Sequence, residues 1–208
     1  MRIIEAALQL FGAQGYDGAM TRDIARAAGV QQPLINYHFG SKEGLWRAAV
    51  THVFSLLSAS VADTLPHLAA LDGRDALALV LRRFVHFNAA HPELTRLMIK
   101  EATARTKRLE WVVEQHVRPT FEAVLSLIRR TQWQGHLRGI DPASAYYLFM
   151  GAATGVFVMA PAYQMLTGVD PFDPARRDAY ADAVVALLLP QSAAAPRRNR
   201  LPAELRLT

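Results

Sequence analysis

The chain has 208 residues, of which 51% are hydrophobic and 20% charged, and it contains no cysteine. This composition is that of an ordered globular protein of one or two domains, and the lack of cysteine excludes disulfides and thiolate metal sites. The net charge is +5, but residues 1–50 hold five cations against four acids, so charge alone singles out no region. The first residues are amphipathic and lack the basic segment and continuous apolar run of a signal peptide, so we expect a cytoplasmic protein.

The first predicted helix spans residues 2–14 and ends at Gly15. Its apolar side chains recur at the spacing of one helical face, which predicts packing against the next helices. The residues of this face are Ile4, Ala7, Leu8 and Phe11.

Residues 21–46, TRDIARAAGVQQPLINYHFGSKEGLW, predict two short helices joined by a tight turn and followed by the start of a longer helix. Thr21 is expected to cap the first helix and Gly29 to end it, since glycine adopts the left-handed conformation at little cost. In the second helix, residues 32–39, Ile35 faces inward and leaves a polar outward face. Two short helices with a glycine-containing turn and such a face are typical of a helix-turn-helix that enters the major groove.

Beyond this segment we expect six further helices and no strand. Ser41 is predicted to cap the first of them and Pro66 to end it, and Pro119 to kink or locally unwind the fourth. Asp141 and Pro142 are expected to begin the fifth. The predicted ranges are residues 41–65, 74–91, 93–105, 107–134, 142–168 and 174–189.

Six short pieces of the first 50 residues resemble the N-terminal domain of the TetR (tetracycline-repressor-type) transcriptional regulators. They are IIEAALQLF from Ile3, GY at 15–16, T-x-x-IA at 21–25, AAGV at 27–30, YHF at 37–39 and SKEGL at 41–45. Their order and spacing make the resemblance specific, and it covers Ile3–Val50. It implies a DNA-binding head, and an effector site and dimer contacts in the remainder of the chain. Asn36 stands where this family usually has tyrosine, so the family's contacts transfer least well there.

We therefore predict an all-α protein of about nine helices, in which a three-helix helix-turn-helix domain precedes a helical ligand-binding and dimerisation domain. Residues 1–47 are predicted to form the DNA-binding domain and residues 48–190 the effector-binding and dimerisation domain. Residues 191–208, rich in arginine, proline and alanine, are predicted to be a flexible tail.

The outward face of residues 32–39 predicts the DNA contacts. Glutamine and asparagine amides pair with adenine N6 and N7, whereas hydroxyl and basic side chains suit phosphates. A solvated polar face is the alternative, with His38 as a capping or hydrogen-bonded histidine. We assign the base edges to Gln31, Gln32 and Asn36. We assign the phosphates to Thr21, Arg22, Tyr37, His38 and Lys42, and Pro33 completes the predicted interface.

Residues 142–169 contain no charged residue and are long enough to span a bilayer. The glycines, the proline and the glutamine inside the run argue against insertion, as do the flanking Asp141 and Asp170, so we expect no membrane contact. The resemblance implies instead that the last two helices, about 142–167 and 174–189, pair with their copies in a homodimer.

Isolated polar side chains on apolar helices predict an effector pocket in the second domain. Glu101 interrupts the apolar stripe of residues 93–105. It is either a buried acid paired with an arginine (Arg82, Arg83 or Arg105 are candidates) or a carboxylate facing a cavity. Each of the other polar groups, taken alone, is better explained as a hydrogen-bonded core residue. The predicted pocket residues are Phe84, Phe87, Asn88, Glu101, Trp111, Gln115, Met150, Thr154 and Phe157; they do not identify the effector.

The sequence contains none of the spacings typical of metal sites or of nucleophilic and nucleotide-dependent catalysis, so we predict no metal, no cofactor and no enzyme activity. The predicted function is a ligand-responsive transcriptional regulator, a repressor released from a palindromic double-stranded DNA operator by a small-molecule effector. The alternative is an α-helical binding protein or enzyme with a non-functional helix-turn-helix. We expect effector binding to shift helix 41–65 through the turn near Pro66 and the kink at Pro119.

Overall fold

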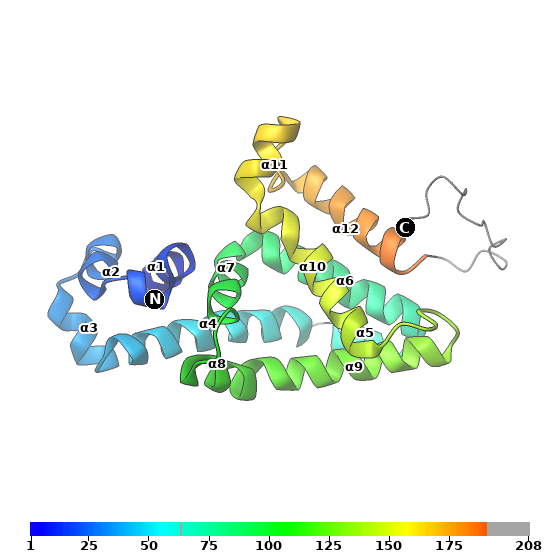
Figure 1. Ribbon diagram of the computed structural model, residues 1–208, viewed down its shortest axis with the longest axis horizontal. Coiled ribbons are helices and arrows are strands. Elements are labelled where there is room, and N and C mark those ends of the chain that lie inside the picture. Colours follow the sequence, from blue (N-terminus) through cyan, green and yellow to red (C-terminus); the bar gives the residue numbers. More distant parts are fainter. Residues whose placement is uncertain (63, 191–208) are drawn as a thin grey trace, which may run out of the picture.

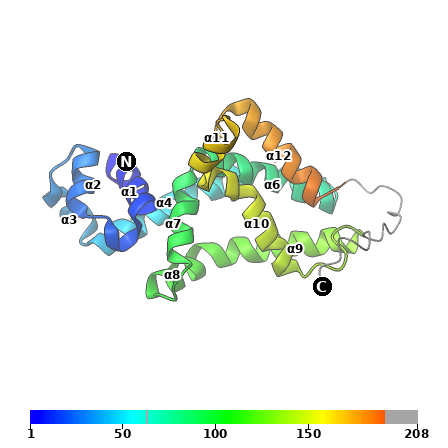
Figure 2. The ribbon, with the colours of Figure 1, turned by 45° about the horizontal axis from the view of Figure 1, so that its top comes forward.

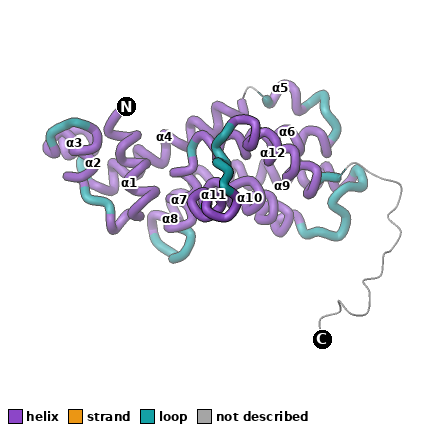
Figure 3. Tube along the Cα trace, turned by 90° about the horizontal axis from the view of Figure 1, so that it is seen from above, coloured by secondary structure: helices purple, strands orange, loops and turns teal. Residues whose placement is uncertain are grey.

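The computed structural model describes residues 1–62 and 64–190, and this part of the chain is helical without any strand (Figure 3). The predicted all-α class is confirmed. The N-terminal helices are α1 (Arg2–Gly18), α2 (Thr21–Ala28), α3 (Gln32–Phe39) and α4 (Lys42–Ala62). They are followed by α5 (Leu65–Leu68), α6 (Gly73–Ala90), α7 (Pro92–Glu101), α8 (Lys107–Val112), the π-helical turn η1 (Val113–Val117), α9 (Arg118–Trp133), α10 (Pro142–Val158), α11 (Ala160–Thr167) and α12 (Pro174–Leu188).

Helices α1 to α3 form a lobe at one end of the molecule, which we call the head, and α5 to α12 form the body; α4 runs from one into the other (Figures 1 and 2). The head closes over fully buried side chains from all four N-terminal helices. Burial of each is worth roughly 1.5–3 kcal/mol. The largest of them are Phe11, Ile24, Ile35, Leu45 and Trp46.

The core of the head continues into the body. Leu94 and Leu97 of α7 belong to the same apolar cluster, and α1 makes its most extensive contacts with α7. A second cluster fills the body, where α6 contacts α9, α10 and α12. The division of the chain at residue 47 stays a prediction, and the predicted tail lies outside the described residues.

Helix α1 is broken at Gly15, whose φ of 76° is left-handed, so the predicted end of the regular helix is confirmed. The predicted cap of α2 is wrong. Met20 occupies the N-cap position, and Thr21 is the first helical residue. Its hydroxyl instead accepts a hydrogen bond from the amide of Gln32, 3.2 Å away, which joins α2 to α3.

Two prolines lie in the first turns of helices where the sequence predicted an end or a kink. The predicted role of Pro66 is wrong, because α4 ends at Ala62 and Pro66 lies in the first turn of α5. Proline suits that position, since the N–H it lacks would be unpaired there. Pro119 is the second residue of α9, which follows the π-helical turn directly, so the predicted local unwinding is confirmed. Proline removes one helical hydrogen bond and crowds the preceding turn.

The charge-free segment is two helices rather than the single predicted helix. α10 and α11 are bent by 68° at Met159, and Pro161 lies in the first turn of α11. By length and composition alone, α4 and this bent pair are long and apolar enough to cross a membrane. The bend argues against one straight span, and α4 contributes Leu45, Trp46 and Val50 to the core of the head.

Candidate nucleic-acid interface

The turn between α2 and α3 sets the direction of α3. Gly29 adopts the left-handed conformation, with φ 65° and ψ 40°, and the Val30 N–H donates to the Ala25 carbonyl at 3.0 Å. Ile35 is completely buried and anchors α3 on the head. The helix is therefore held by one face and leaves the other to solvent.

The outward face of α3 carries every residue predicted to contact DNA from that segment. Tyr37 is 83% exposed and His38 is exposed as well, which excludes a core role for this histidine. Arg22 on α2 is also exposed, although its guanidinium lies 3.9 Å from the Asp23 carboxylate. The exposed residues at the start of α3 and along it are Gln31, Gln32, Pro33, Leu34, Asn36, Tyr37 and His38.

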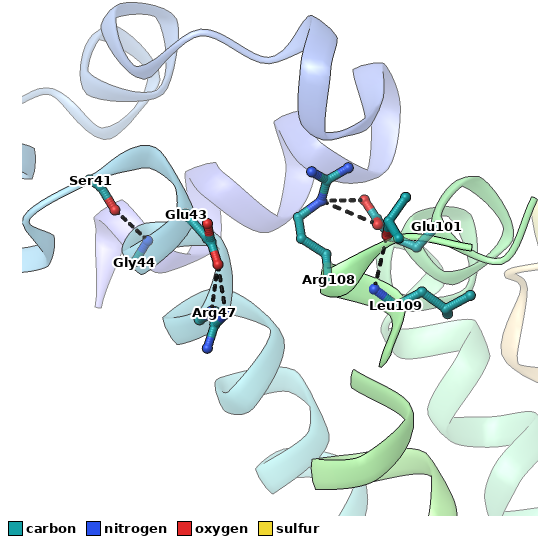
Figure 4. Close-up of polar contacts among 8 residues, drawn as sticks. Ser41, Glu43, Gly44, Arg47, Glu101, Arg108 and Leu109 are labelled. Atoms are coloured by element: carbon teal, nitrogen blue, oxygen red, sulfur yellow. Dashed lines mark hydrogen bonds and ion pairs between the residues drawn. The ribbon is translucent and has the colours of Figure 1, made fainter. Parts of the chain in front are cut away.

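Lys42 lies at the start of α4, beside the end of α3. Ser41 caps α4 by accepting a hydrogen bond from the Gly44 N–H at 3.0 Å, as predicted (Figure 4). A Cβ at Gly44 would lie 2.1 Å from the Phe39 carbonyl oxygen, so only glycine permits this close approach of α3 and α4. The Lys42 ammonium donates to the Asp17 carbonyl at 3.3 Å and keeps further donors for a phosphate.

The residues predicted to line an effector pocket fall into two groups. Phe87 and Trp111 pack in or against the core of the head, whereas Met150 and Phe157 belong to or border that of the body. Phe84 packs against both clusters. The structure therefore does not gather the set around one space, and the pocket stays a prediction.

The predicted polar pocket residues have other surroundings. The Asn88 amide donates to the Phe84 carbonyl at 2.7 Å and accepts from Thr95, and the Thr154 hydroxyl donates to the Met150 carbonyl at 2.8 Å. Both are hydrogen-bonded core groups, which was the alternative to a pocket role. Gln115 is exposed on η1.

Glu101 is buried and paired with an arginine, but the predicted partners are wrong. Its carboxylate lies 3.3 Å from Nε of Arg108 (Figure 4). Arg82 instead pairs with Asp182 of α12, and Arg105 lies 3.9 Å from Glu110. Because α7 ends at Glu101, the following loop turns Arg108 back toward it, a contact that helical spacing does not reveal.

Two open cavities are lined almost entirely by residues that were not predicted to line the effector pocket; Glu101 is the exception. One of about 200 Å³ lies among α10, α11 and α12, lined by Val156, Tyr163, Pro171, Arg176, Ala179 and Tyr180. The other, of about 330 Å³, lies where head meets body and is called here the junction cleft. Its walls are residues 14–18 of α1 together with Lys100, Glu101, Thr103, Ala104, Thr106 and Arg108.

The body also contacts α4 through His116 of η1. The imidazole stacks on Phe54 with ring centroids 4.9 Å apart, and its Nε2 lies 3.4 Å from the Thr51 hydroxyl. Burial lowers the pKa of His116 below its ordinary value of 6.5. The neutral imidazole is therefore the form that suits this contact.

An all-α chain whose head presents a polar helix after a glycine turn has the architecture of a helix-turn-helix protein. Residues 3–49 match the family of bacterial regulatory proteins described as the tetR family, and residues 74–188 match the tetracyclin repressor-like C-terminal domain. The chain belongs to the TetR family of transcriptional regulators.

Individual relatives agree with this assignment. The HTH-type transcriptional regulator RutR of Escherichia coli (strain K12) is 25% identical over 166 residues, which cover 80% of this chain and 77% of RutR. YttP of Bacillus subtilis (strain 168), named a probable HTH-type transcriptional regulator, is 28% identical over 102 residues, 49% of each protein. These relatives are named as regulators rather than as enzymes.

The fold has counterparts among solved structures. AibR, solved in complex with isovaleryl coenzyme A and operator DNA, superimposes with a TM-score of 0.71. The two chains are 19% identical, and the match covers 90% of this chain and 96% of AibR. At this identity the likeness concerns the fold.

Proposed function

We propose that the protein is a homodimeric repressor whose two α3 helices enter successive major grooves of an operator and whose body binds a small-molecule effector. The observation that carries this proposal is the exposed polar face of α3 opposite the buried Ile35. Amides at Gln31, Gln32 and Asn36 would read bases, and the neighbouring hydroxyl and basic groups would hold phosphates. Such a protein acts in the cytoplasm.

The surface of the body supports dimerisation. Helix α10 exposes an apolar stripe at helical spacing, in which Leu148 is 56% exposed and a Cβ at Gly151 would meet nothing within 4 Å. Helix α12 exposes a second stripe of small and apolar residues, and the two helices contact each other. Apolar patches of this kind mark protein–protein contacts. The members are Leu148 and Gly151 on α10, Met159 directly after it, and Ala179, Ala183, Ala186 and Leu187 on α12.

A twofold dimer suits the DNA, because its two heads can read two half-sites of a near-palindrome. The half-sites would lie about 34–36 Å apart, one turn of the duplex, or a whole multiple of that distance. Small residues such as Gly151 and Gly155 allow helices from two copies to approach closely.

The effector would bind in the body and favour one orientation of the heads over the other. A ligand can shift that equilibrium only by the difference between its affinities for the two states. AibR was solved with isovaleryl coenzyme A, so short-chain acyl coenzyme A molecules are the first effector class to test.

The proposal is tested by selecting duplexes from a random-sequence library with the full chain, then titrating the recovered duplex by fluorescence anisotropy at several salt concentrations. We expect a near-palindromic site and a linear fall of log K with log salt, as for proteins that neutralise phosphates. Acyl coenzyme A added at saturation is expected to release the duplex. Recovery of no duplex, or binding that does not respond to salt, would refute the DNA-binding function.

A further inference from the structure

The head rests on α7 along the whole of that helix. At one end a Cβ on Gly12 would lie 3.0 Å from the Glu93 carbonyl oxygen, so the backbones of α1 and α7 are in close contact there. At the other end the Lys100 ammonium donates to the Ala13 carbonyl at 3.0 Å. A displacement of α7 would therefore carry α1 with it.

Beyond the break at Gly15, the ring of Tyr16 sits between the head and the body. It stacks on Phe11, with centroids 6.0 Å apart, and meets the edge of Trp46 at 6.1 Å. Two cations lie over it: the Arg108 guanidinium carbon at 3.9 Å from the ring centroid and the Lys42 ammonium at 4.7 Å. A cation of the body and a cation of the DNA-facing surface thus share one aromatic ring.

Glu101 fixes the position of Arg108. Its side chain is 5% exposed, and its two carboxylate oxygens lie 3.3 and 3.4 Å from Nε of Arg108 (Figure 4). Thr106 caps α8 by accepting from the Leu109 N–H at 3.0 Å, which holds the corner between α7 and α8. A buried carboxylate paired with a planar guanidinium has a defined geometry, so the ring of Tyr16 is placed relative to this corner.

We infer that Glu101 and Arg108 are positioning residues for DNA binding, which act through Tyr16 on the orientation of Lys42 and of the head. This inference rests on the proposed function. The predicted movement of α4 is one route by which the body can affect DNA binding. The contacts of α7 and α8 at the junction cleft provide a second route. An effector that displaces α7 or α8 would shift the head along this route even with α4 unbent.

The first test is a double-mutant cycle with the duplex recovered by selection, measured by anisotropy. Arg108→Ala is expected to weaken binding about threefold to tenfold, in the range of a cation–π contact and its ion pair. In a Lys42→Ala background the same change should weaken binding less than about twofold, since non-additivity is the mark of residues that act together. The matched control is Arg105→Ala, an arginine 91% exposed in the loop between α7 and α8, which should leave the affinity within about twofold.

The second test needs no DNA and uses hydrogen exchange of the full chain. Arg108→Ala and Glu101→Gln are expected to raise amide exchange in residues 13–20 and at the start of α4, and to leave α10 and α12 unchanged. Arg108→Lys keeps a cation near the ring and should show an intermediate effect, which also guards against a variant that fails to fold.

Two outcomes overturn the inference: additive effects of Arg108→Ala and Lys42→Ala on binding, or unchanged exchange at residues 13–20 in Arg108→Ala. If the unaltered chain binds no duplex, the proposed function fails. The exchange measurement then still decides whether Arg108 holds the head against the body.

Discussion

The outward faces of α3 and α10 differ in chemistry, although both helices are anchored by one buried side. Helix α3 exposes mainly amides, an imidazole and a phenol, which water solvates well, with Leu34 as its one exposed aliphatic side chain. Helix α10 exposes Leu148 and Gly151 beside Tyr147, and the exposed Met159 follows at its end. A polar face is solvated in the absence of a partner, whereas exposed apolar patches mark contacts with other proteins. The kind of partner that a helix binds is therefore inferred from the residues that it exposes rather than from those that it buries.

The largest effect is expected when a charge is placed on the apolar face of α10, because this tests whether that face is a protein–protein contact. Leu148→Glu is expected to destabilise the dimer by about 3–5 kcal/mol, because a carboxylate would be buried without a partner. Sedimentation equilibrium should then show monomers, and operator affinity should fall with dimerisation. Trp133→Glu is the control, since Trp133 is 97% exposed at the end of α9 and belongs to neither stripe. A dimer that survives Leu148→Glu would show that α10 is not the contact.

On the polar face, Asn36→Ala is expected to change which base is preferred. Loss of a paired amide costs about 1–3 kcal/mol of discrimination at one base pair. Competition between the selected duplex and its single-base variants measures this preference. Unchanged selectivity at every position would remove Asn36 from the base contacts. It is the most informative position, because family resemblance alone predicts a tyrosine there.

A smaller and different effect is expected from Lys42→Ala. Loss of one phosphate contact should weaken binding to all sequences and reduce the slope of log K against log salt by about one unit. The measurement is the same anisotropy titration at several salt concentrations. An unchanged slope would mean that the Lys42 ammonium serves only Tyr16 and the Asp17 carbonyl.

The smallest expected effect concerns pH and the contact between η1 and α4. Because burial lowers the pKa of His116 in the folded chain, the unfolded chain binds the proton more tightly. Stability is therefore full above the unfolded pKa, near 6.5, and declines as the pH falls toward the folded pKa. In thermal unfolding from about pH 7.5 to about pH 5.5, His116→Gln should show a shallower loss than the unaltered protein. Equal pH slopes would contradict a buried neutral imidazole.

The head was largely predictable from the sequence because its signals are local. Gly29 ends α2, Ile35 points inward and Ser41 caps α4, each through neighbours within four residues. The cap of α2 was wrong because Thr21 bonds across to Gln32, a contact between helices. The local sequence pattern was therefore sufficient to locate the helices. The hydrogen-bond partner of a side chain such as Thr21 depends on contacts between helices, which the pattern does not show.

The body was less predictable, for two physical reasons. Hydrophobicity alone does not distinguish one buried helix from two, so the charge-free run was predicted as a single helix. Pro161, in the first turn of α11, was the local signal for the break at Met159. The partner of Glu101 is fixed by how the loop after α7 folds back, so Arg108 could not be chosen over Arg105 from spacing. The effector residues suffer from the same limit, because a pocket is made by elements far apart in the chain.

The central claim is that α3 of each copy reads a major groove of one duplex. Methylation protection of guanine N7 on the selected duplex tests it directly, because N7 lies in the major groove. We expect two protected patches whose centres lie one helical turn apart, about 10 bp, or a whole multiple of it, with two chains bound per duplex. Protection confined to the minor groove, or a single patch from a lone chain, would contradict the account.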